Sequence, residues 1–413
     1  EGMADNAAAF ADTPVRYYPY VEPAAGAGSG LLEALAAQAC VVVTDEFPCF
    51  FLPRMIAAAA GRVDVRMEQV DSNGLLPIRA PGDRVFGRAV DLRRWLQKNL
   101  APHLRETPRA RPLAQLGLAA AHVPQAILDR WPAASAAMLR GDADELAALP
   151  IDHGVEPVTD RRGGHGAARE RLTKFLDSAL GRYDEDRNHP DREGGSGLSP
   201  WLHFGHLSVH EVLAELGRRE DWTPDAVGTI ANGKREGWWH MSAAAESFLD
   251  ELVTWREIGL NFCARRADYD RYDSLPDWAK ATLGEHEKDR RPHLYTFDEL
   301  DEARTADPIW NAAQRELRRD GRIHNYLRML WGKRVLEWSP TPEIAVEILI
   351  ELNNRYALDG RDPNSYSGIF WVFGRYDRPW VPERPVFGNI RFMSSERTPA
   401  KVRMREYLAE FGS

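Results

Sequence analysis

A carboxylate and an indole lie four residues apart in a segment whose apolar pattern is typical of a helix. Glu251 and Trp255 fall within residues 247–257, and positions i and i+4 of a helix share one face. Such a pair could act together on a ligand. A half-buried tryptophan beside a solvated acid would give the same pattern, and the spacing alone favours that structural interpretation.

Three further tryptophans, Trp310, Trp331 and Trp338, are close together in the sequence. The last two are seven residues apart, so on a helix they project from the same face two turns from each other. Indoles are large core side chains, and packing is the usual reason for such a stripe. Redox hopping is the other use, and it requires the rings to line up from the surface to a buried oxidant. The spacing does not decide between them, and packing is the favoured interpretation.

Residues 352–364 are rich in Asn, Asp, Arg and Gly and lie between two apolar segments. This composition is typical of a turn-rich loop, which is the favoured interpretation. A long polar loop of this kind could instead hold a heteroaromatic ligand by its hydrogen-bonding edge.

Aromatic and basic residues alternate between positions 370 and 391. Aromatic rings with guanidinium neighbours suit unstacked bases and phosphates, and a generic protein interface fits about as well. The residues are Trp371, Phe373, Arg375, Tyr376, Arg378, Trp380, Arg384 and Arg391.

Elements of two kinds must position these side chains. Residues 1–130 alternate short β-branched runs with Ala/Leu-rich stretches, a pattern typical of parallel α/β units. The absence of GxGxxG and P-loop sequences leaves no sign of a dinucleotide site there. The expected strands are 15–21, a buried 40–45, and 63–70, with helices at 30–38 and 51–60.

The second half is helical in period. Residues 151–166 have the composition of a connecting loop, and from residue 167 onward nearly every segment follows a helical pattern. The stretch 312–338 is expected to form two helices that break near Asp320 and Gly321. The clearest helices are 167–180, 208–218, 243–261, 312–338 and 342–356.

Composition narrows the class of protein. The 413 residues are 44% hydrophobic and 28% charged, and no apolar run approaches the ~20 residues that cross a membrane. Three cysteines without CxxC spacing predict no disulfide scaffold and no metal site, and they fit a reducing cytoplasm. The chain does not begin with Met, and residues 1–12 look like part of a helix entered midway, so we expect a further upstream segment.

Charge is unevenly distributed along the chain. Residues 309–413 contain 17 Lys+Arg and 13 Asp+Glu, a net charge of +4. Because the whole chain has a net charge of −9, residues 1–308 have a net charge of −13. A basic C-terminal part fits a protein that meets phosphates there, although a solvated charged surface fits about as well.

Taken together, five strings resemble the class II cyclobutane pyrimidine dimer (CPD) photolyases of the photolyase/cryptochrome family. The resemblance runs from about residue 31 to the end and is dense from residue 198. The strings occur in family order, which makes the set specific. They are GLSPWLHFG at 197–205, the Glu251/Trp255 helix with Asn261-Phe262-Cys263, DPIWNAAQ at 307–314, RMLW at 328–331, and LDGRDPN at 358–364.

The resemblance implies an α/β N-terminal domain with a doubly wound parallel sheet, truncated at its start, and a large all-α domain. The expected bounds are 1–130 for the first domain, 131–166 for the linker, and 167–413 for the FAD- and DNA-binding domain. The first strands of the family's α/β domain are absent, which puts the binding of an antenna pigment in doubt.

The resemblance also implies a U-shaped FAD inside the helical domain, active in its fully reduced form. Arg328 and Asp359 would form an ion pair beside the isoalloxazine ring, and Asn353 would face the flavin N5, where an amide can stabilise added electron density. The phosphates and the adenosine part would be contacted by Tyr183, Ser196, Leu198, Ser199 and Arg256.

The implied reaction is a carbon–carbon lyase reaction on UV-damaged DNA. Light-excited reduced flavin would give one electron to the cyclobutane ring of a flipped-out dimer, the ring would split, and the electron would return. Glu251 would hydrogen-bond the dimer, while Trp310, Trp331 and Trp338 match the family's electron-transfer chain. The pocket walls would be Trp255, Met329 and Trp371, and the DNA-facing residues Arg378, Trp380 and Arg391.

Two departures from the family pattern concern the DNA-facing loop. The usual Gly-Val-His-Asp type of segment is here Gly374-Arg375-Tyr376-Asp377, in a loop one residue shorter and without the His, and Ser365 replaces a usual Gly. We therefore expect a different loop shape.

Three other functions share part of this pattern of residues. A cryptochrome-like photoreceptor is the main one, and retention of Glu251, Trp255, Met329 and Trp371 favours repair over it. A helical DNA-binding protein without flavin is disfavoured by Asn353 and the Arg328/Asp359 pair, and a dark flavin oxidoreductase lacks a nicotinamide-site signal. The expectation is a cytoplasmic monomer that acts on DNA and not on membranes.

Overall fold

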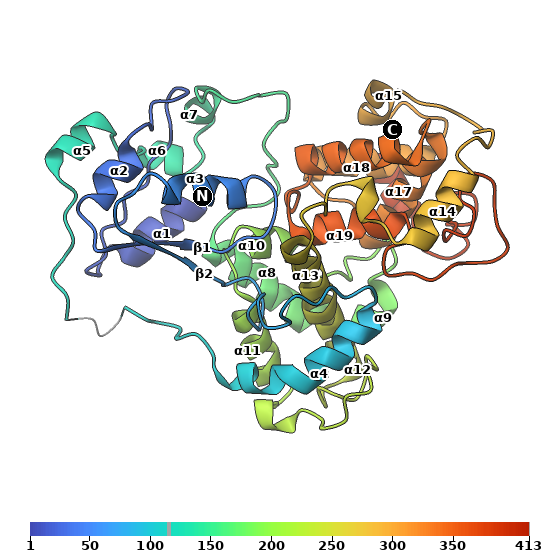
Figure 1. The fold of residues 1–413 in the computed structure, drawn as a ribbon, viewed down its shortest axis with the longest axis horizontal. Coiled ribbons are helices and arrows are strands. Elements are labelled where there is room, and N and C mark those ends of the chain that lie inside the picture. The colour runs from blue at the N-terminus through green and yellow to red at the C-terminus, as the bar shows by residue number, and fades with distance from the viewer. Residues whose placement is uncertain (114–116, 413) are drawn as a thin grey trace.

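The computed structural model describes residues 1–113 and 117–412. A small α/β region lies beside a larger helical region (Figure 1). The expected order of an α/β region followed by a large helical region is confirmed.

The α/β region contains a two-stranded parallel sheet. Strands β1 (Val41–Asp45) and β2 (Arg66–Val70) pair with Val41 opposite Arg66. This confirms the strands expected at 40–45 and 63–70. The helices of this region are α1 (Gly2–Phe10), α2 (Leu31–Ala36) and α3 (Leu52–Ala60), which confirms those expected at 30–38 and 51–60.

Two details of this region were predicted wrongly. Residues 15–21 form no strand, because the backbone oxygens of Pro14 and Pro19 bond singly to the amides of Ala121 and Ala134 and the prolines supply no N–H for a ladder. The 40–45 strand is not buried either. In the described part of the chain it pairs with β2 alone, and it alternates exposed and half-buried residues, with Val43 58% exposed.

The helical region is built from helices of unequal length. Those that precede the π-helical segment Asp250–Trp255 are α8 (His165–Ser178), α9 (Tyr183–Asp186), α10 (Ser199–His203), α11 (Val209–Arg219) and α12 (Ala243–Leu249). Those that follow it are α13 (Arg256–Arg265), α14 (Asp277–Glu285), α15 (Phe297–Asp301), α16 (Pro308–Asp320), α17 (Asn325–Trp338), α18 (Pro342–Tyr356), α19 (Pro363–Val372) and α20 (Arg405–Phe411).

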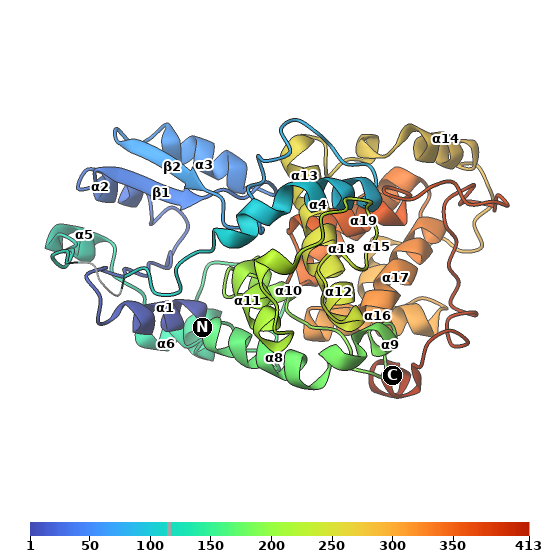
Figure 2. The ribbon, with the colours of Figure 1, turned by 90° about the horizontal axis from the view of Figure 1, so that it is seen from below.

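The helix α4 (Ala89–Arg105) lies against this region rather than on the sheet. Figure 2 shows it beside α12 and α13, and its Leu92, Leu96 and Leu100 share a hydrophobic core with Leu172 of α8 and Phe248 of α12. The predicted boundary at residue 130 therefore encloses a segment that packs with the helical region. The short helices α5 (Gln125–Arg130), α6 (Ala136–Leu139) and α7 (Ala143–Ala147) lie near that boundary, which stays a prediction.

A second hydrophobic core lies between α13, α16, α17, α18 and α19. Helix α19 contacts both cores: Tyr366, Ile369, Phe370 and Val372 belong to the second, whereas Trp371 packs against the first. This helix therefore forms the seam between the two cores, and the packing of both cores affects its position.

Local sequence explains where the central helices begin and end. Asp307 caps α16 by accepting the backbone N–H groups of Ile309 and Trp310, with Pro308 in the first turn. Gly321, in the left-handed conformation (φ 63°), ends it, which confirms the expected break. No helix of the described ranges is long and apolar enough to span a bilayer.

Candidate functional site

The π-helical segment between α12 and α13 carries the acid and the indole. π turns inside helices occur frequently at functional sites. Glu251 Oε1 lies 2.5 Å from an Arg187 guanidinium nitrogen, and that guanidinium lies 5.3 Å from the Tyr183 ring centre. Burial raises the pKa of Glu251, and the Arg187 charge opposes this rise. The Glu251 side chain is 37% exposed, so it is ion-paired yet still accessible.

Arg187 was missed by sequence reasoning. It lies in a polar stretch after α9, 64 residues before its partner Glu251. The only local signal is its position four residues after Tyr183, one helical turn away. Burial, followed by the charge of Glu251, raises the pKa of Tyr183 to about 12, so this phenol stays neutral beside the ion pair.

Two of the expected pocket tryptophans are stacked face to face. The rings of Trp255 and Trp371 have centroids 4.3 Å apart and planes at 16°, and Tyr376 meets Trp255 edge-on at 6.3 Å. Both indoles are half-buried, so the pair presents a flat aromatic surface at the π-helical segment. Met329, the third expected wall residue, is half-buried and packs against the second core, and its place in the pocket wall stays a prediction.

Asn353, Arg328 and Asp359 gather at the C-terminal end of α18. Asn353 is 3% exposed, and no hydrogen-bond partner for its Nδ2 occurs within residues 1–113 and 117–412. Asp359 Oδ1 lies 3.5 Å from an Arg328 nitrogen, an ion-pair contact that does not meet hydrogen-bond geometry, and it too lacks a partner in the described ranges. The Asp359–Arg361 turn packs closely on Asn353, since a Cβ on Gly360 would lie 2.7 Å from the Asn353 carbonyl oxygen.

These partnerless atoms indicate a ligand. A buried donor or acceptor left unpaired costs about 1–3 kcal/mol. An amide N–H of Asn353 and a carboxylate oxygen of Asp359 fit a molecule whose edge offers both an acceptor and a donor. The isoalloxazine ring of FAD has such an edge, so the residues present fit the cofactor expected from the sequence.

The residues expected at the FAD phosphates and adenosine are less uniformly placed. Tyr183 and Leu198 are buried (6% and 1% exposed), whereas Ser199 is exposed at the start of α10. The Ser196 carbonyl oxygen accepts a 2.6 Å hydrogen bond from Arg171 Nε, which fixes the backbone of this segment.

Arg256 is 8% exposed and donates its Nε to the Asn73 carbonyl oxygen at 3.2 Å. Its neighbour Glu257 accepts the Leu75 backbone N–H at 3.1 Å. Burial raises the pKa of Glu257 to about 8. The 71–78 loop, which sequence reasoning did not connect to the site, thus holds the start of α13 in place.

The three tryptophans of α16 and α17 lie together in the core. Trp310 and Trp338 have ring centroids 5.6 Å apart, and Trp310 Nε1 donates to the Trp331 carbonyl oxygen at 3.0 Å. Trp331 Nε1 donates to Gln314 Oε1 at 2.9 Å. All three are at most 3% exposed, so the packing interpretation holds. Their contact also leaves the electron-transfer interpretation open.

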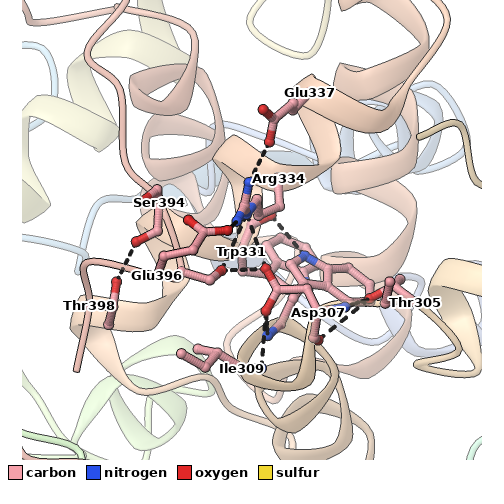
Figure 3. A network of polar contacts seen from close by, with 12 residues as sticks. Thr305, Asp307, Ile309, Trp331, Arg334, Glu337, Ser394, Glu396 and Thr398 are labelled. Carbon is pink, nitrogen blue, oxygen red and sulfur yellow. Dashed lines mark hydrogen bonds and ion pairs between the residues drawn. The ribbon is translucent and has the colours of Figure 1, made fainter. Parts of the chain in front are cut away.

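A polar network surrounds this group (Figure 3). The Arg334 guanidinium bonds to Asp307 at 3.0 Å, Glu337 at 2.6 Å and Glu396 at 2.9 Å, and it lies 5.6 Å from the Trp338 ring centre. Because Asp307 also caps α16, the network ties α16 to α17 and fixes the rings between them. Three carboxylates around one guanidinium make the surroundings of Trp338 net negative, which favours a positive charge on the indole.

The residues expected to face DNA lie on the segment after α19. Arg378 and Arg391 both place their guanidinium groups over the Trp380 ring, at 5.7 Å and 5.3 Å from its centroid. Trp380 is 40% exposed, and its backbone N–H donates to the Asn389 carbonyl oxygen at 2.8 Å. An exposed indole between two arginines suits contact with a nucleic acid.

Comparison with known proteins adds relatives and fold neighbours, although no family model matches the chain. The chain is 37% identical over 262 residues to a deoxyribodipyrimidine photo-lyase of Potorous tridactylus. The aligned region covers 63% of the chain and 46% of the relative. Relatives of that same description from Arabidopsis thaliana and Methanothermobacter thermautotrophicus are each 32% identical. The aligned regions cover 83% and 90% of this chain, and 64% and 74% of the respective relatives.

Solved structures share the fold at low identity. A class III photolyase from Agrobacterium tumefaciens superposes with a TM-score of 0.67 at 17% identity, over 99% of this chain and 75% of that one. A cryptochrome from Synechocystis superposes with a TM-score of 0.60 at 15% identity, over 99% of this chain and 76% of that one. The photolyase-like fold expected from the sequence is confirmed. The chain spans between about half and two thirds of the length of the first two relatives given above.

Proposed function

The chain belongs to the deoxyribodipyrimidine photo-lyase family, and from this premise we propose that it is a class II enzyme that splits cyclobutane pyrimidine dimers in DNA with light. The observation that carries the proposal is the Trp255/Trp371 stack, which lies one turn from the accessible Glu251 carboxyl. A flat aromatic surface beside a hydrogen-bonding acid suits a pyrimidine dimer. The five strings quoted above support the assignment to class II.

FAD is the proposed cofactor. Asn353 and the Arg328/Asp359 pair would hold its ring edge, because Asn353 Nδ2 and Asp359 Oδ1 are buried and have no hydrogen-bond partner among the described residues. Tyr183, Leu198 and the Ser196–Ser199 backbone would hold its other end together with Arg256. When bound, FAD supplies the absorption of light and the electron for the reaction.

Glu251 is the proposed contact to the lesion. Burial raises the pKa of Glu251, and a protonated carboxyl at this place would donate a hydrogen bond to a pyrimidine carbonyl. Negative charge develops on that carbonyl when the dimer accepts an electron, so a donor held there stabilises the reduced lesion. Arg187 would keep the carboxyl aimed at the same place.

Trp310, Trp331 and Trp338 are the proposed path by which an electron enters the protein core. The Trp310 and Trp338 rings lie 5.6 Å apart, and the Trp310 indole is hydrogen-bonded to the Trp331 backbone, which supports this path. The net-negative surroundings of Trp338 favour this indole as the place where the positive charge rests. Trp380 with Arg378 and Arg391 would occupy the gap that the flipped dimer leaves in the duplex.

The test is dimer loss from a UV-irradiated oligonucleotide incubated with FAD-loaded, reduced protein in near-UV or blue light and in darkness. We expect dimers to disappear only in the light. Equal dimer content in both arms, with FAD bound and reduced, would overturn the repair proposal. Light-dependent flavin reduction without dimer loss would favour the alternative, a cryptochrome-like photoreceptor.

A further inference from the structure

Tyr376 is a buried aromatic residue that the proposed reaction does not use, and it lies beside the stacked indoles. It belongs to the first hydrophobic core and is 8% exposed. Its ring meets the Trp255 ring edge-on, with centroids 6.3 Å apart and planes at 78°. Aromatic pairs prefer this arrangement to a face-to-face sandwich. Trp255 therefore contacts two aromatic rings, Trp371 by stacking and Tyr376 edge-to-face.

The Tyr376 hydroxyl joins this ring to the helix that carries the other indole. It accepts a hydrogen bond from Ser367 Oγ at 3.2 Å, and both residues are buried. Ser367 lies on α19 four residues before Trp371, so the two side chains share one face of the helix. Burial raises the pKa of Tyr376 to about 12, so the phenol is neutral at physiological pH. One side chain thus contacts Trp255 through its ring and the helix of Trp371 through its hydroxyl.

The backbone of Tyr376 is in a conformation that a bulky side chain rarely adopts. Its φ is 71°, in the left-handed region that glycine adopts at no steric cost. Such a conformation persists only where the surrounding contacts determine it, and it occurs often at ligand sites. Tyr376 also lies within residues 374–377, the segment that departs from the family pattern.

The turn that carries Tyr376 is fixed on both sides of the seam. The Gly374 N–H donates to the Trp371 carbonyl oxygen at 3.1 Å, which closes the turn on the end of α19. The next residue, Arg375, is 5% exposed, and its guanidinium lies 3.9 Å from the ring centre of Phe262 in the second core. With Arg375 held there and Tyr376 in the first core, the backbone between them has little room to relax.

We infer that Tyr376 is a positioning residue for the lesion pocket: its ring braces Trp255 and its hydroxyl fixes α19 through Ser367, so that Trp255 and Trp371 stay stacked as a preformed surface for a pyrimidine dimer. This inference rests on the proposed function for its consequence in repair, whereas the placement of the rings is measurable without DNA. A preformed pocket binds its ligand more tightly, because its side chains need no ordering at binding.

Deletion of one hydrogen bond separates this role from the packing of the ring. Tyr376→Phe removes the hydroxyl and keeps the ring, and Ser367→Ala removes the other partner. These variants and the double variant are compared with the FAD-loaded wild type. Tyr407→Phe is the matched control, because this phenol is also buried and hydrogen-bonded, at 2.9 Å to Glu316, but belongs to α20 and the second core.

Two readouts report the pocket and a third reports stability. Two indoles 4.3 Å apart couple excitonically, so their circular dichroism reports their arrangement without DNA or light-driven chemistry. In each background this coupled signal is the difference from the same protein with Trp371→Phe. The second readout is the ratio of affinities for one oligonucleotide with and without a dimer. The midpoint of denaturant unfolding measures the stability that the loss of any buried hydroxyl removes.

Tyr376→Phe is expected to weaken the coupled signal and to lower the affinity for the dimer about three- to tenfold, the range that corresponds to one buried hydrogen bond. Ser367→Ala should have the same effect. The double variant should lose no more than either single variant, because both substitutions break the same bond. Tyr407→Phe should lower the unfolding midpoint and leave both pocket readouts unchanged.

Unchanged pocket readouts in Tyr376→Phe would overturn the inference. Equal losses in Tyr407→Phe would also overturn it, since they would assign the effect to stability alone, and so would losses that add in the double variant. If Tyr376→Phe does not fold, Ser367→Ala decides by the same readouts. Failure of the proposed function is a separate result: the wild type would not discriminate dimer-containing from undamaged DNA, and the coupled signal alone would then decide whether Tyr376 positions the rings.

Discussion

Replacement of Glu257 by glutamine should change how the stability of the protein depends on pH. Glu257 is buried on α13, where it accepts the Leu75 N–H at 3.1 Å, and burial raises its pKa from 4.5 to about 8. The folded state therefore holds a proton on this carboxyl between pH 4.5 and 8 that the unfolded chain has already released. The stability that this proton provides is complete below pH 4.5 and is lost as pH rises toward 8.

The magnitude follows from the linkage between proton binding and folding. Each pH unit within that window changes the free energy of unfolding by about 1.4 kcal/mol. Between pH 5 and pH 7, the titration of Glu257 should therefore lower the free energy of unfolding by about 2.7 kcal/mol. Glu257→Gln keeps an acceptor for Leu75 but cannot titrate. The variant should thus lose about 2.7 kcal/mol less than the wild type across the same interval.

Denaturant unfolding at several pH values between 5 and 7 measures the difference, with Glu170→Gln on the exposed face of α8 as the matched control. The control should follow the wild-type profile within a few tenths of a kcal/mol. Profiles for Glu257→Gln and wild type that run parallel would refute the reasoning, because they would show that Glu257 titrates alike in both states.

Three further changes test the site and its packing. Glu251→Ala should slow repair at saturating light, because the Glu251 carboxyl is the proposed contact to the lesion. The FAD content, measured by absorbance, should stay unchanged, and a loss of FAD would assign Glu251 a structural role instead. Trp338→Phe should block photoreduction of oxidised FAD yet spare repair by protein already reduced, and normal photoreduction in transient absorption would remove Trp338 from the electron path. Gly332→Ala should destabilise the protein by about 1–3 kcal/mol in denaturant unfolding, because its Cβ would lie 2.5 Å from Val372, and an unchanged midpoint would show that the helices separate easily.

Local patterns predicted the helices and their ends well. The break at Gly321 and the helix Pro342–Tyr356 follow from a capping glycine and from a threonine cap followed by proline. The family resemblance predicted that Arg328 and Asp359 would pair, and they lie 3.5 Å apart. The roles of these residues toward FAD stay predictions.

Long-range contacts could not be predicted in the same way. The pairing of Arg187 with Glu251 spans 64 residues, and that of Leu75 with Glu257 spans 182. Neither has a local pattern, because each depends on which surfaces the packed helices bring together. Residues 15–21 show the reverse case: their composition predicts a strand, but within the described residues this segment has single backbone hydrogen bonds and no ladder.

The position of α19 between the two cores has a consequence for how substitutions combine. Phe370 and Val372 pack into one core and Trp371 against the other, so repacking either core shifts the same short helix. Substitutions too far apart to touch would then influence each other at Trp371, and their effects there would not add. Substitutions in the two cores are therefore expected to be epistatic. Which substitutions one core tolerates should depend on which residues fill the other.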